Sequence, residues 1–160
     1  MAEARAVTSS RPSVCLVCSS GGHFAELNRL RTAWDDFEPV WVTLDAHDTR
    51  SVLDTERTVF AHGPTNRSLT NLVRNTVLAW RVLGRERPIA VISTGAGLAV
   101  PFLLVARLRG IVGVYIESLA RVSELSLSGR ISYRLAREFL VQWPELAARY
   151  PRARYEGRVL

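Results

Sequence analysis

The stretch Val14–Glu26, read as VCLVCSSGGHFAE, constrains the fold of this chain more than any other. Its apolar run, Val14–Cys18, predicts a buried strand, and Gly21 and Gly22 follow it as a turn. The pattern of an amphipathic helix begins directly after that turn. Strand, glycine turn and helix in this order predict the first unit of a doubly wound, Rossmann-like α/β sheet, whose ligand sites lie at the carboxyl ends of the strands.

The rest of the chain continues the alternation of strands and helices. Further strands are expected at Pro39–Leu44, Thr58–Ala61, Pro88–Ile92, Val112–Ile116 and Phe139–Trp143. Helices are expected at Phe24–Asp35, Thr49–Glu56, Ser68–Leu83, Leu98–Arg109, Ser128–Ala136 and Pro144–Tyr150. This order predicts a parallel sheet with right-handed crossovers. The closing YEGRVL is either a seventh strand or an exposed tail.

The 160 residues are enough for one domain with a substantial core. We expect residues 1–13 to form a polar tail and residues 14–160 a single Rossmann-like domain. The N-terminus lacks the apolar core of a signal peptide. The longest apolar block near mid-chain, Leu98–Ala106, contains Pro101 and is far shorter than the about twenty residues of a membrane-spanning helix.

The unusual residues of the chain gather where predicted strands end. They are Ser20, Gly21, Gly22 and His23 after the first strand, Asp45 after the second, Thr94, Gly95 and Gly97 after the fourth, and Glu117, Ser118 and Arg121 after the fifth. Carboxyl ends of parallel strands share one edge of the sheet, and core packing does not require this clustering. We therefore expect a binding site at that edge.

Each member of this cluster has a chemical interpretation and a plainer one. The two glycine turns present backbone N–H groups at helix starts, which suits phosphate or pyrophosphate, although glycine is common in such turns. An unperturbed histidine side chain changes its charge near neutral pH, so a histidine at position 23 could act as a general base, or it could simply be a polar residue at a helix start. Glu117 could be a base, an acceptor for a sugar hydroxyl or a helix cap. Arg121 could pair with Glu117 or hold a phosphate.

Several other functions are disfavoured. SSGGH lacks the third glycine of the G-x-G-x-x-G dinucleotide fingerprint, although Asp45 lies near the place of a ribose-binding acid, so a nicotinamide-dependent oxidoreductase stays an alternative. Cys15 and Cys18 are three apart on a strand, point to opposite faces and are expected to be buried thiols. His47 and His62 are expected in surface turns. We find no metal-ligand spacing and no Walker lysine, and predict neither metal nor cofactor.

All 21 basic residues are arginine and the formal net charge is +6. Arginine favours planar, bidentate binding of phosphate and carboxylate groups. The arginines are spread along the chain, which fits a phosphate-bearing substrate or an anionic membrane surface as well as nucleic acid. We expect no nucleic-acid partner.

Three stretches, VCLVCSSGGHFAEL, ISTGAGLAVPFLLVARLRG and VYIESLARV, together resemble a known set. They resemble the acceptor-side subunit of the two-part glycosyltransferases of lipid-linked oligosaccharide synthesis, the asparagine-linked-glycosylation "fourteen" type and its bacterial exopolysaccharide relatives. The resemblance runs from about Val14 to the C-terminus. More distantly, the chain is similar to the N-terminal half of the transferase that makes lipid II.

This resemblance implies one half of a glycosyltransferase-B fold, the acceptor-binding and membrane-recruiting subunit of a heterodimeric inverting glycosyltransferase. A sugar, N-acetylglucosamine or a uronic acid, would move from a UDP-sugar, held by a donor-binding partner subunit, to a lipid-pyrophosphate-linked saccharide. Gly21, Gly22 and His23 would line the cleft, with Thr94, Gly95 and Gly97 near the acceptor pyrophosphate and Glu117 and Arg121 beside them. A non-catalytic scaffold that recruits a partner transferase is the alternative.

The resemblance also implies a cytoplasmic location with peripheral membrane contact. Eukaryotic members carry an N-terminal membrane anchor, which is not seen in this sequence. A basic, apolar face on the Leu69–Leu83 helix or the Leu98–Arg109 helix could replace it, but ordinary core packing is the simpler expectation for both. In the first of these helices one stripe contains Leu69, Leu72, Val73, Thr76, Trp80 and Leu83, and Asn71, Arg74, Asn75 and Arg81 lie off it. The basic segment Tyr150–Leu160 is the expected contact with the partner subunit.

Overall fold

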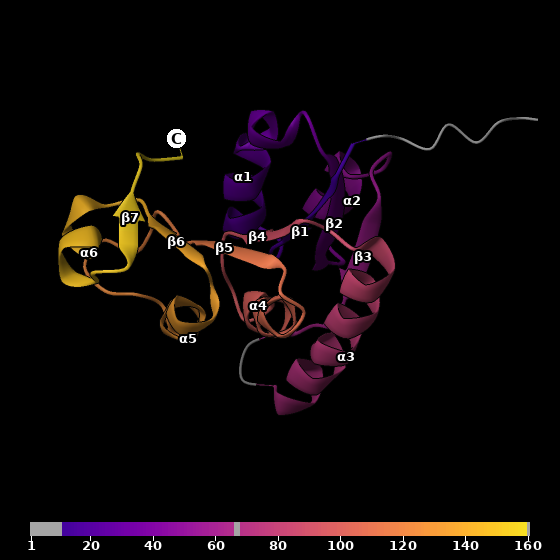
Figure 1. Ribbon diagram of the computed structural model, residues 1–160. Coiled ribbons are helices and arrows are strands. Elements are labelled where there is room, and N and C mark those ends of the chain that lie inside the picture. Colours follow the sequence, from indigo (N-terminus) through magenta and orange to yellow (C-terminus); the bar gives the residue numbers. More distant parts are fainter. Residues whose placement is uncertain (1–10, 66–67, 160) are drawn as a thin grey trace, which may run out of the picture.

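The computed structural model describes residues 11–65 and 68–159 (Figure 1). The strands are β1 (Ser13–Val17), β2 (Glu38–Leu44), β3 (Thr58–Ala61), β4 (Ala90–Ser93), β5 (Val112–Ile116), β6 (Glu138–Val141) and β7 (Ala153–Tyr155). The helices are α1 (Gly22–Arg29), the 3₁₀ helix η1 (Arg31–Trp34), α2 (His47–Val52), α3 (Leu69–Glu86), α4 (Ala99–Leu108), α5 (Leu127–Leu135) and α6 (Pro144–Arg149).

The strands form one seven-stranded sheet in the order β3-β2-β1-β4-β5-β6-β7, and every neighbouring pair is parallel. Cys15 on β1 lies opposite Val40 on β2 and Val91 on β4. The strand order reverses between β1 and β4, and this switch point is where doubly wound sheets bind ligands. The predicted Rossmann-like parallel α/β fold is confirmed.

Two helical layers cover the sheet. Figure 1 shows α1 and α2 on one side and α3, α4 and α5 on the other. Phe24 and Leu27 of α1 pack with Leu16 and Trp41 on the first side, whereas α4 supplies Phe102 and its apolar neighbours to the larger core on the second. Each face of the sheet thus has its own apolar core, which explains the continuously apolar strands.

The two cysteines lie in different cores. Cys15 belongs to the core beneath α3 and α4, and Cys18 to the core beneath α1. Both are free and buried. Burial raises the pKa of the Cys15 thiol and raises that of Cys18 to about 12. The expectation of two buried thiols on opposite faces of the strand is therefore confirmed.

Two helices differ in extent from the prediction. The helix expected at Phe24–Asp35 breaks at Leu30, whose N–H bonds to the Leu27 carbonyl in a tighter 3₁₀ turn. The helix expected at Thr49–Glu56 is α2, which begins two residues earlier because Thr49 Oγ1 accepts the Ala46 N–H at 3.2 Å. His47 is therefore the first helical residue rather than part of a turn, and it is exposed, as is His62.

The chain ends are tied to the sheet. Residues 1–10 of the expected tail lie outside the described residues. Ser13 already belongs to β1, and the Pro12 carbonyl accepts the Glu38 N–H. At the other end, β7 forms the last strand and the Val159 N–H donates to Gln142 Oε1 at 2.8 Å.

The longest helix, α3, turns most of its predicted apolar stripe away from the core, although Leu83 at its C-terminal end is buried. The expected core stripe is largely in solvent: Leu69 is 75% exposed, Val73 59% and Trp80 51%. Asn71 and Asn75, expected outside that stripe, are buried instead. By contrast, α4 is core-packed as expected, with most of its side chains buried. None of the described helices is both long enough and apolar enough to span a bilayer.

Candidate functional site

The turn between β1 and α1 leaves its backbone open to an approaching ligand. Gly21 has a φ of 79°, a conformation that favours glycine. Nothing lies within 4 Å of the position that a Cβ would take at Gly21 or Gly22. Ser20 precedes them, half-buried, and α1 begins at Gly22. The turn therefore exposes its backbone at the positive end of a helix dipole, although the Gly21 N–H itself already has a partner in Asp48.

A reciprocal pair of hydrogen bonds joins His23 to the loop after β4. His23 Nδ1 lies 2.8 Å from the Thr94 carbonyl oxygen, and Thr94 Oγ1 donates to the His23 carbonyl at 2.6 Å. A carbonyl can only accept, so Nδ1 carries the proton. The ring orientation is thereby fixed, and Nε2 is the nitrogen left to accept a proton.

The loop after β4 is shaped by glycines that fit against its neighbours. Gly95 has a φ of 118°, and a Cβ there would lie 3.0 Å from His23 Cε1 and 3.2 Å from the Tyr115 hydroxyl. A Cβ at Gly97 would lie 2.6 Å from the Thr65 carbonyl. Thr94 and Gly95 are buried. This loop thus packs directly against the imidazole, and the loops after the first and fourth strands lie side by side at one edge of the sheet.

Glu117 does not line this edge with its side chain. It is fully buried, and its carboxylate accepts hydrogen bonds from the Ser126 N–H and hydroxyl, each at 3.1 Å. Gly129 is the place of close approach: a Cβ there would lie 1.9 Å from Glu117 Oε2. Burial raises the pKa of Glu117, while the bonds from Ser118 and Ser126 and the charge of Arg121 oppose that rise.

The expectation that Glu117 is a catalytic base is therefore corrected. A carboxylate enclosed by the start of α5 cannot contact an acceptor hydroxyl, and Glu117 has the third role considered, that of stabilising a helix start. Arg121 is exposed beside it, but within the described residues the two do not come within ion-pair distance. Ser118 is half-buried and donates to Glu26 Oε1 at 3.0 Å.

Glu26 and Asp48 were missed by the sequence analysis. Glu26 is buried on α1, one turn after His23, and its Oε1 also accepts the Leu119 N–H, so it ties α1 to the loop after β5. Asp48 Oδ2 accepts the Gly21 N–H at 2.7 Å. Glu26 could have been found from its position one helical turn after His23, and Asp48 from its position just beyond the end of β2.

Asp45, which was considered for a ribose-binding role, is exposed and paired with Arg50. Arg50 Nη2 donates to Asp45 Oδ2 at 2.6 Å, and this hydrogen bond lowers the pKa of the carboxyl group. The place of the missing third glycine is taken by the region of Phe24, whose buried ring packs edge-on against Trp41 at 5.7 Å. Among the described residues, no group of three or more His, Cys, Asp or Glu is placed to hold a metal ion.

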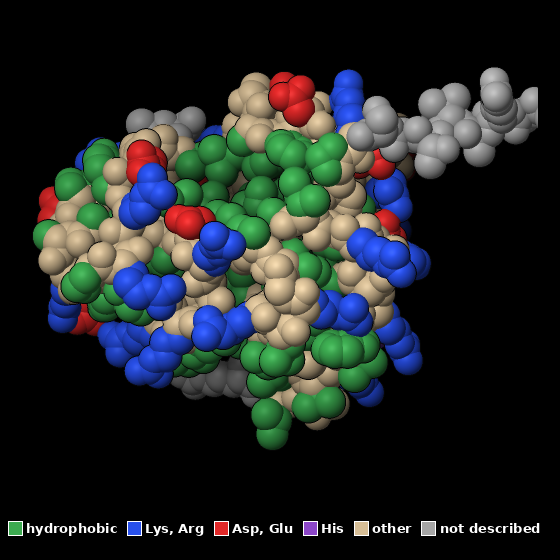
Figure 2. Space-filling model, in the orientation of Figure 1, with side chains coloured by type: hydrophobic (Ala, Val, Ile, Leu, Met, Phe, Trp, Pro, Cys, Tyr) green, Lys and Arg blue, Asp and Glu red, His purple; other side chains and the backbone are tan. Residues whose placement is uncertain are grey.

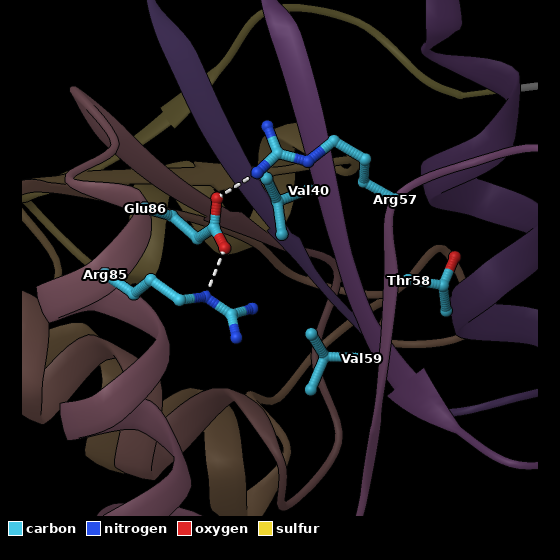
Figure 3. A pocket seen from close by; sticks show the side chains of 6 residues that line it. All are labelled: Val40, Arg57, Thr58, Val59, Arg85 and Glu86. Atoms are coloured by element: carbon cyan, nitrogen blue, oxygen red, sulfur yellow. Dashed lines mark hydrogen bonds and ion pairs between the residues drawn. The ribbon is translucent and has the colours of Figure 1, made fainter.

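Two surface hollows lie at the other edge of the sheet, where the strands begin. One, of about 360 Å³, is lined by Val40 and Val59 and by the ion-paired residues Arg57, Arg85 and Glu86 (Figure 3). Glu86 binds both arginines, one of them at 2.7 Å. The second, of about 380 Å³, includes Arg107 and Arg152, which donate to carbonyls at the end of α5. Both clusters hold elements together, so neither competes with the glycine-loop edge as the ligand site.

Comparison with known proteins adds independent findings. Residues 53–159 match the family described as "Oligosaccharide biosynthesis protein Alg14 like". The chain is 40% identical over 89 residues to human UDP-N-acetylglucosamine transferase subunit ALG14, a match that covers 52% of this chain and 41% of the human protein. It is 28% identical over 176 aligned residues to the Yarrowia lipolytica protein of the same name, covering 92% and 81%. The matches span about two-fifths of the human, rat and mouse proteins.

Solved structures share the fold. The crystal structure of Acinetobacter baumannii MurG superposes with a TM-score of 0.71 at 16% identity, covering 92% of this chain and 45% of that one. The UDP-GlcNAc 2-epimerase from Neisseria meningitidis, bound to UDP-GlcNAc, gives 0.66 at 14% identity, with 92% and 47% covered. The chain therefore corresponds to about half of each structure, and the predicted half of a glycosyltransferase-B fold is confirmed.

Proposed function

The chain belongs to the Alg14-like family of oligosaccharide biosynthesis proteins, and we propose that it is the acceptor-binding, membrane-recruiting subunit of a two-chain inverting glycosyltransferase. A donor-binding partner subunit holds the UDP-sugar, and a lipid-pyrophosphate-linked saccharide is the acceptor. N-acetylglucosamine is the sugar favoured by the names of the relatives, which are UDP-N-acetylglucosamine transferase subunits. The complex works peripherally on the cytoplasmic face of the membrane.

The observation that carries this proposal is the reciprocal pair between His23 and Thr94. It holds together the two glycine loops that flank the switch point and orients the imidazole between them. If the cleft is built from two chains, the glycine-loop site of this chain is expected to be an open edge of the sheet until the partner faces it. Such an edge suits a reaction that is completed by a facing partner domain.

In the proposed mechanism, His23 Nε2 takes the proton of the acceptor hydroxyl as its oxygen attacks the anomeric carbon. The bond from that carbon to the UDP oxygen breaks as the new glycosidic bond forms, with inversion, and UDP leaves with the bonding electron pair. The Nδ1–H bond to Thr94 stabilises the resulting imidazolium. Glu117 takes no part in the proton transfer.

The acceptor pyrophosphate binds at the two loops. The Gly22 amide lies at the start of α1 and Gly97 lies two residues before α4, and the dipoles of both helices favour an anion there. Exposed Arg121 supplies a positive charge. Ser20 precedes Gly21 and offers its hydroxyl to the saccharide. The Ser118 hydroxyl donates to Glu26, so it can only accept a hydrogen bond from the saccharide. These roles predict that the loops determine acceptor affinity, while His23 determines turnover.

The test is transfer by the assembled two-chain complex with His23 changed. His23→Ala should lower kcat by roughly a hundredfold or more, because general-base catalysis is lost while the fold is kept. His62→Ala, at an exposed histidine after β3, is the matched control and should leave kcat unchanged. Near-normal turnover by His23→Ala removes His23 as the base. If the partner subunit alone is fully active on a soluble acceptor analogue, this chain acts only as a non-catalytic scaffold.

The partner contact is proposed at the C-terminal segment Tyr150–Leu160. It contains the edge strand β7 and the arginines Arg152, Arg154 and Arg158. Arg154 already pairs with Glu156 at 2.7 Å and with Glu138 at 3.3 Å. Deletion of residues 157–160, which follow β7, should weaken the complex, and an unchanged complex argues against this location.

A further inference from the structure

The outward face of α3 is apolar although its inward face carries asparagines. Val73, Val77 and Trp80 are between 46% and 59% exposed and Leu69 is 75% exposed. At helical spacing these side chains form one stripe. A surface helix of an ordinary domain turns such a stripe toward the core, so this arrangement needs a physical cause.

The cause is a set of hydrogen bonds on the buried side. The Asn75 side chain accepts the His62 N–H and donates to the His62 carbonyl, both at 2.9 Å. Asn71 Nδ2 donates to the Pro64 carbonyl at 2.9 Å. These bonds hold the loop after β3 and fix the rotation of α3. The apolar stripe is therefore held in solvent by buried polar contacts.

The C-terminal half of α4 extends this surface. Leu104 and Leu108, one helical turn apart, are 37% and 68% exposed, and α3 and α4 pack side by side. Arg109 joins the two helices, since its guanidinium lies 4.1 Å from the centre of a Trp80 ring and donates to the Trp80 carbonyl at 3.1 Å. We call the exposed side chains Leu69, Leu72, Val73, Val77, Trp80, Leu104 and Leu108 the α3–α4 surface.

Positive charge surrounds the α3–α4 surface. The helices α3, α4 and α5 contain one acidic residue, Glu86, which is paired with Arg57 and Arg85. Their exposed arginines, counting the one that follows α4, are Arg74, Arg81, Arg85, Arg107, Arg109, Arg130 and Arg134. Figure 2 shows the hydrophobic side chains over α3 at the lower right, with arginines beside them and along the lower left.

We propose that the α3–α4 surface docks on an anionic lipid bilayer. This inference rests on the proposed function, because it gives a lipid-linked acceptor a route to the site. Leucine, valine and tryptophan side chains insert at the headgroup boundary, and each neighbouring arginine adds about 1 kcal/mol of attraction to anionic lipid. A second copy of the chain is a poor occupant, since pairing the same face would bring like charges together.

The docking orientation also suits the glycine loops. The loop that leads into α3 contacts the loop after β4, where Thr65 lies against Gly97. The Leu69 end of the α3–α4 surface therefore lies at the same edge of the sheet as the His23–Thr94 pair. A lipid-linked saccharide in the bilayer would extend its pyrophosphate toward that edge.

The test is flotation of the chain with vesicles of phosphatidylcholine, with and without phosphatidylglycerol. Val73→Asp and Val77→Asp should each lower the partition coefficient on anionic vesicles by roughly tenfold or more, because a charge replaces an inserted apolar group. Val52→Asp is the matched control: Val52 is a 44% exposed helical valine on α2, across the sheet. It should bind as the unchanged chain does. Arg74→Gln with Arg81→Gln should weaken binding only where phosphatidylglycerol is present.

Two results overturn this proposal: flotation unaffected by Val73→Asp and Val77→Asp, or an oligomer in solution that these changes dissociate. The test is separable from that of the proposed function. Vesicle binding that depends on Val73, without any transfer by the assembled complex, refutes the transferase proposal and keeps the docking surface. If the complex transfers sugar to a soluble acceptor in a reaction that depends on His23, but the chain does not bind vesicles, the docking surface is refuted and the transferase proposal is kept.

Discussion

Gly95 is the position where one added methyl group should disturb the site most directly. Gly95→Ala places a Cβ 3.0 Å from His23 Cε1 and 3.1 Å from Nδ1, at a backbone φ of 118° that L side chains rarely adopt. Gly22→Ala is the matched control in the other glycine loop, because a Cβ there meets nothing within 4 Å. Comparison of the two variants separates the effect of backbone conformation and close packing at Gly95 from the general effect of replacing a loop glycine by alanine.

The expected cost of Gly95→Ala has two parts. Holding alanine in a sparsely populated backbone region costs about 1–3 kcal/mol. Displacing the imidazole breaks the Nδ1–H bond to the Thr94 carbonyl, which costs about 0.5–1.5 kcal/mol. The free energy of unfolding should therefore fall by about 2–4 kcal/mol. Gly22→Ala should change it by less than about 1 kcal/mol, with a stabilising sign where the helix gains rigidity.

Urea unfolding followed by circular dichroism measures both changes. A loss of 3 kcal/mol also lowers the Tm by roughly 6–12 °C for a domain of this size. If Gly95→Ala proves as stable as Gly22→Ala, the close packing of His23 on the β4 loop is wrong. If the variant is destabilised yet keeps full transferase activity, the imidazole orientation does not matter to catalysis.

Two further changes test the buried polar contacts. The pKa of Glu117 is higher in the folded chain than its ordinary value of 4.5, so the folded chain binds this proton more tightly. The free energy of unfolding should therefore rise as the pH falls through the raised pKa toward 4.5, and Glu117→Gln should remove this rise in urea titrations at a series of pH values. Parallel pH profiles for the two proteins would contradict this prediction. Asn75→Ala removes both hydrogen bonds to the His62 backbone and should lower the free energy of unfolding by about 2–4 kcal/mol. Thr70→Ala, at an exposed position of the same helix, is the control and should change it little. Equal stability of the two variants would show that Asn75 does not hold α3 in place.

The sheet and its ligand edge could be predicted because local patterns determine them. The apolar run at Val14–Val17, the turn at Gly21 and the second turn at Gly95 signal strand ends without knowledge of distant contacts. Parallel connectivity then places the loops after β1 and β4 next to each other. For this reason the proximity of His23 and Thr94 followed from sequence, although their hydrogen bonds did not.

The orientation of α3 could not be predicted from its periodicity. A stripe such as Leu69, Val73 and Trp80 shows that a helix is amphipathic, but not that its apolar side faces the core. Here Asn71 and Asn75 bind backbone groups of the loop at residues 62–64, and those partners are visible only in three dimensions. Buried hydrogen bonds outweigh the usual preference and turn the stripe outward.

Glu117 illustrates the same limit at the site. Its place at a strand end was predicted correctly, yet direction along a strand alternates, and the next helix closes over this carboxylate because Gly129 has no side chain. Asp48 was overlooked for the converse reason. It follows a strand end by several residues, and only the start of α2 brings it back to Gly21.

The hydrogen bonds between His23 and Thr94 connect residues 71 positions apart, so the geometry of the glycine-loop edge depends on the folding of most of the chain. Contacts of such high sequence separation form only after the long intervening loop has closed and β1 has found β4. A partly folded chain that contains only the first βαβ units therefore lacks an oriented imidazole. The NMR signals of the His23 ring should consequently report the fully folded population, and the orientation of this ring should appear in one late, cooperative step.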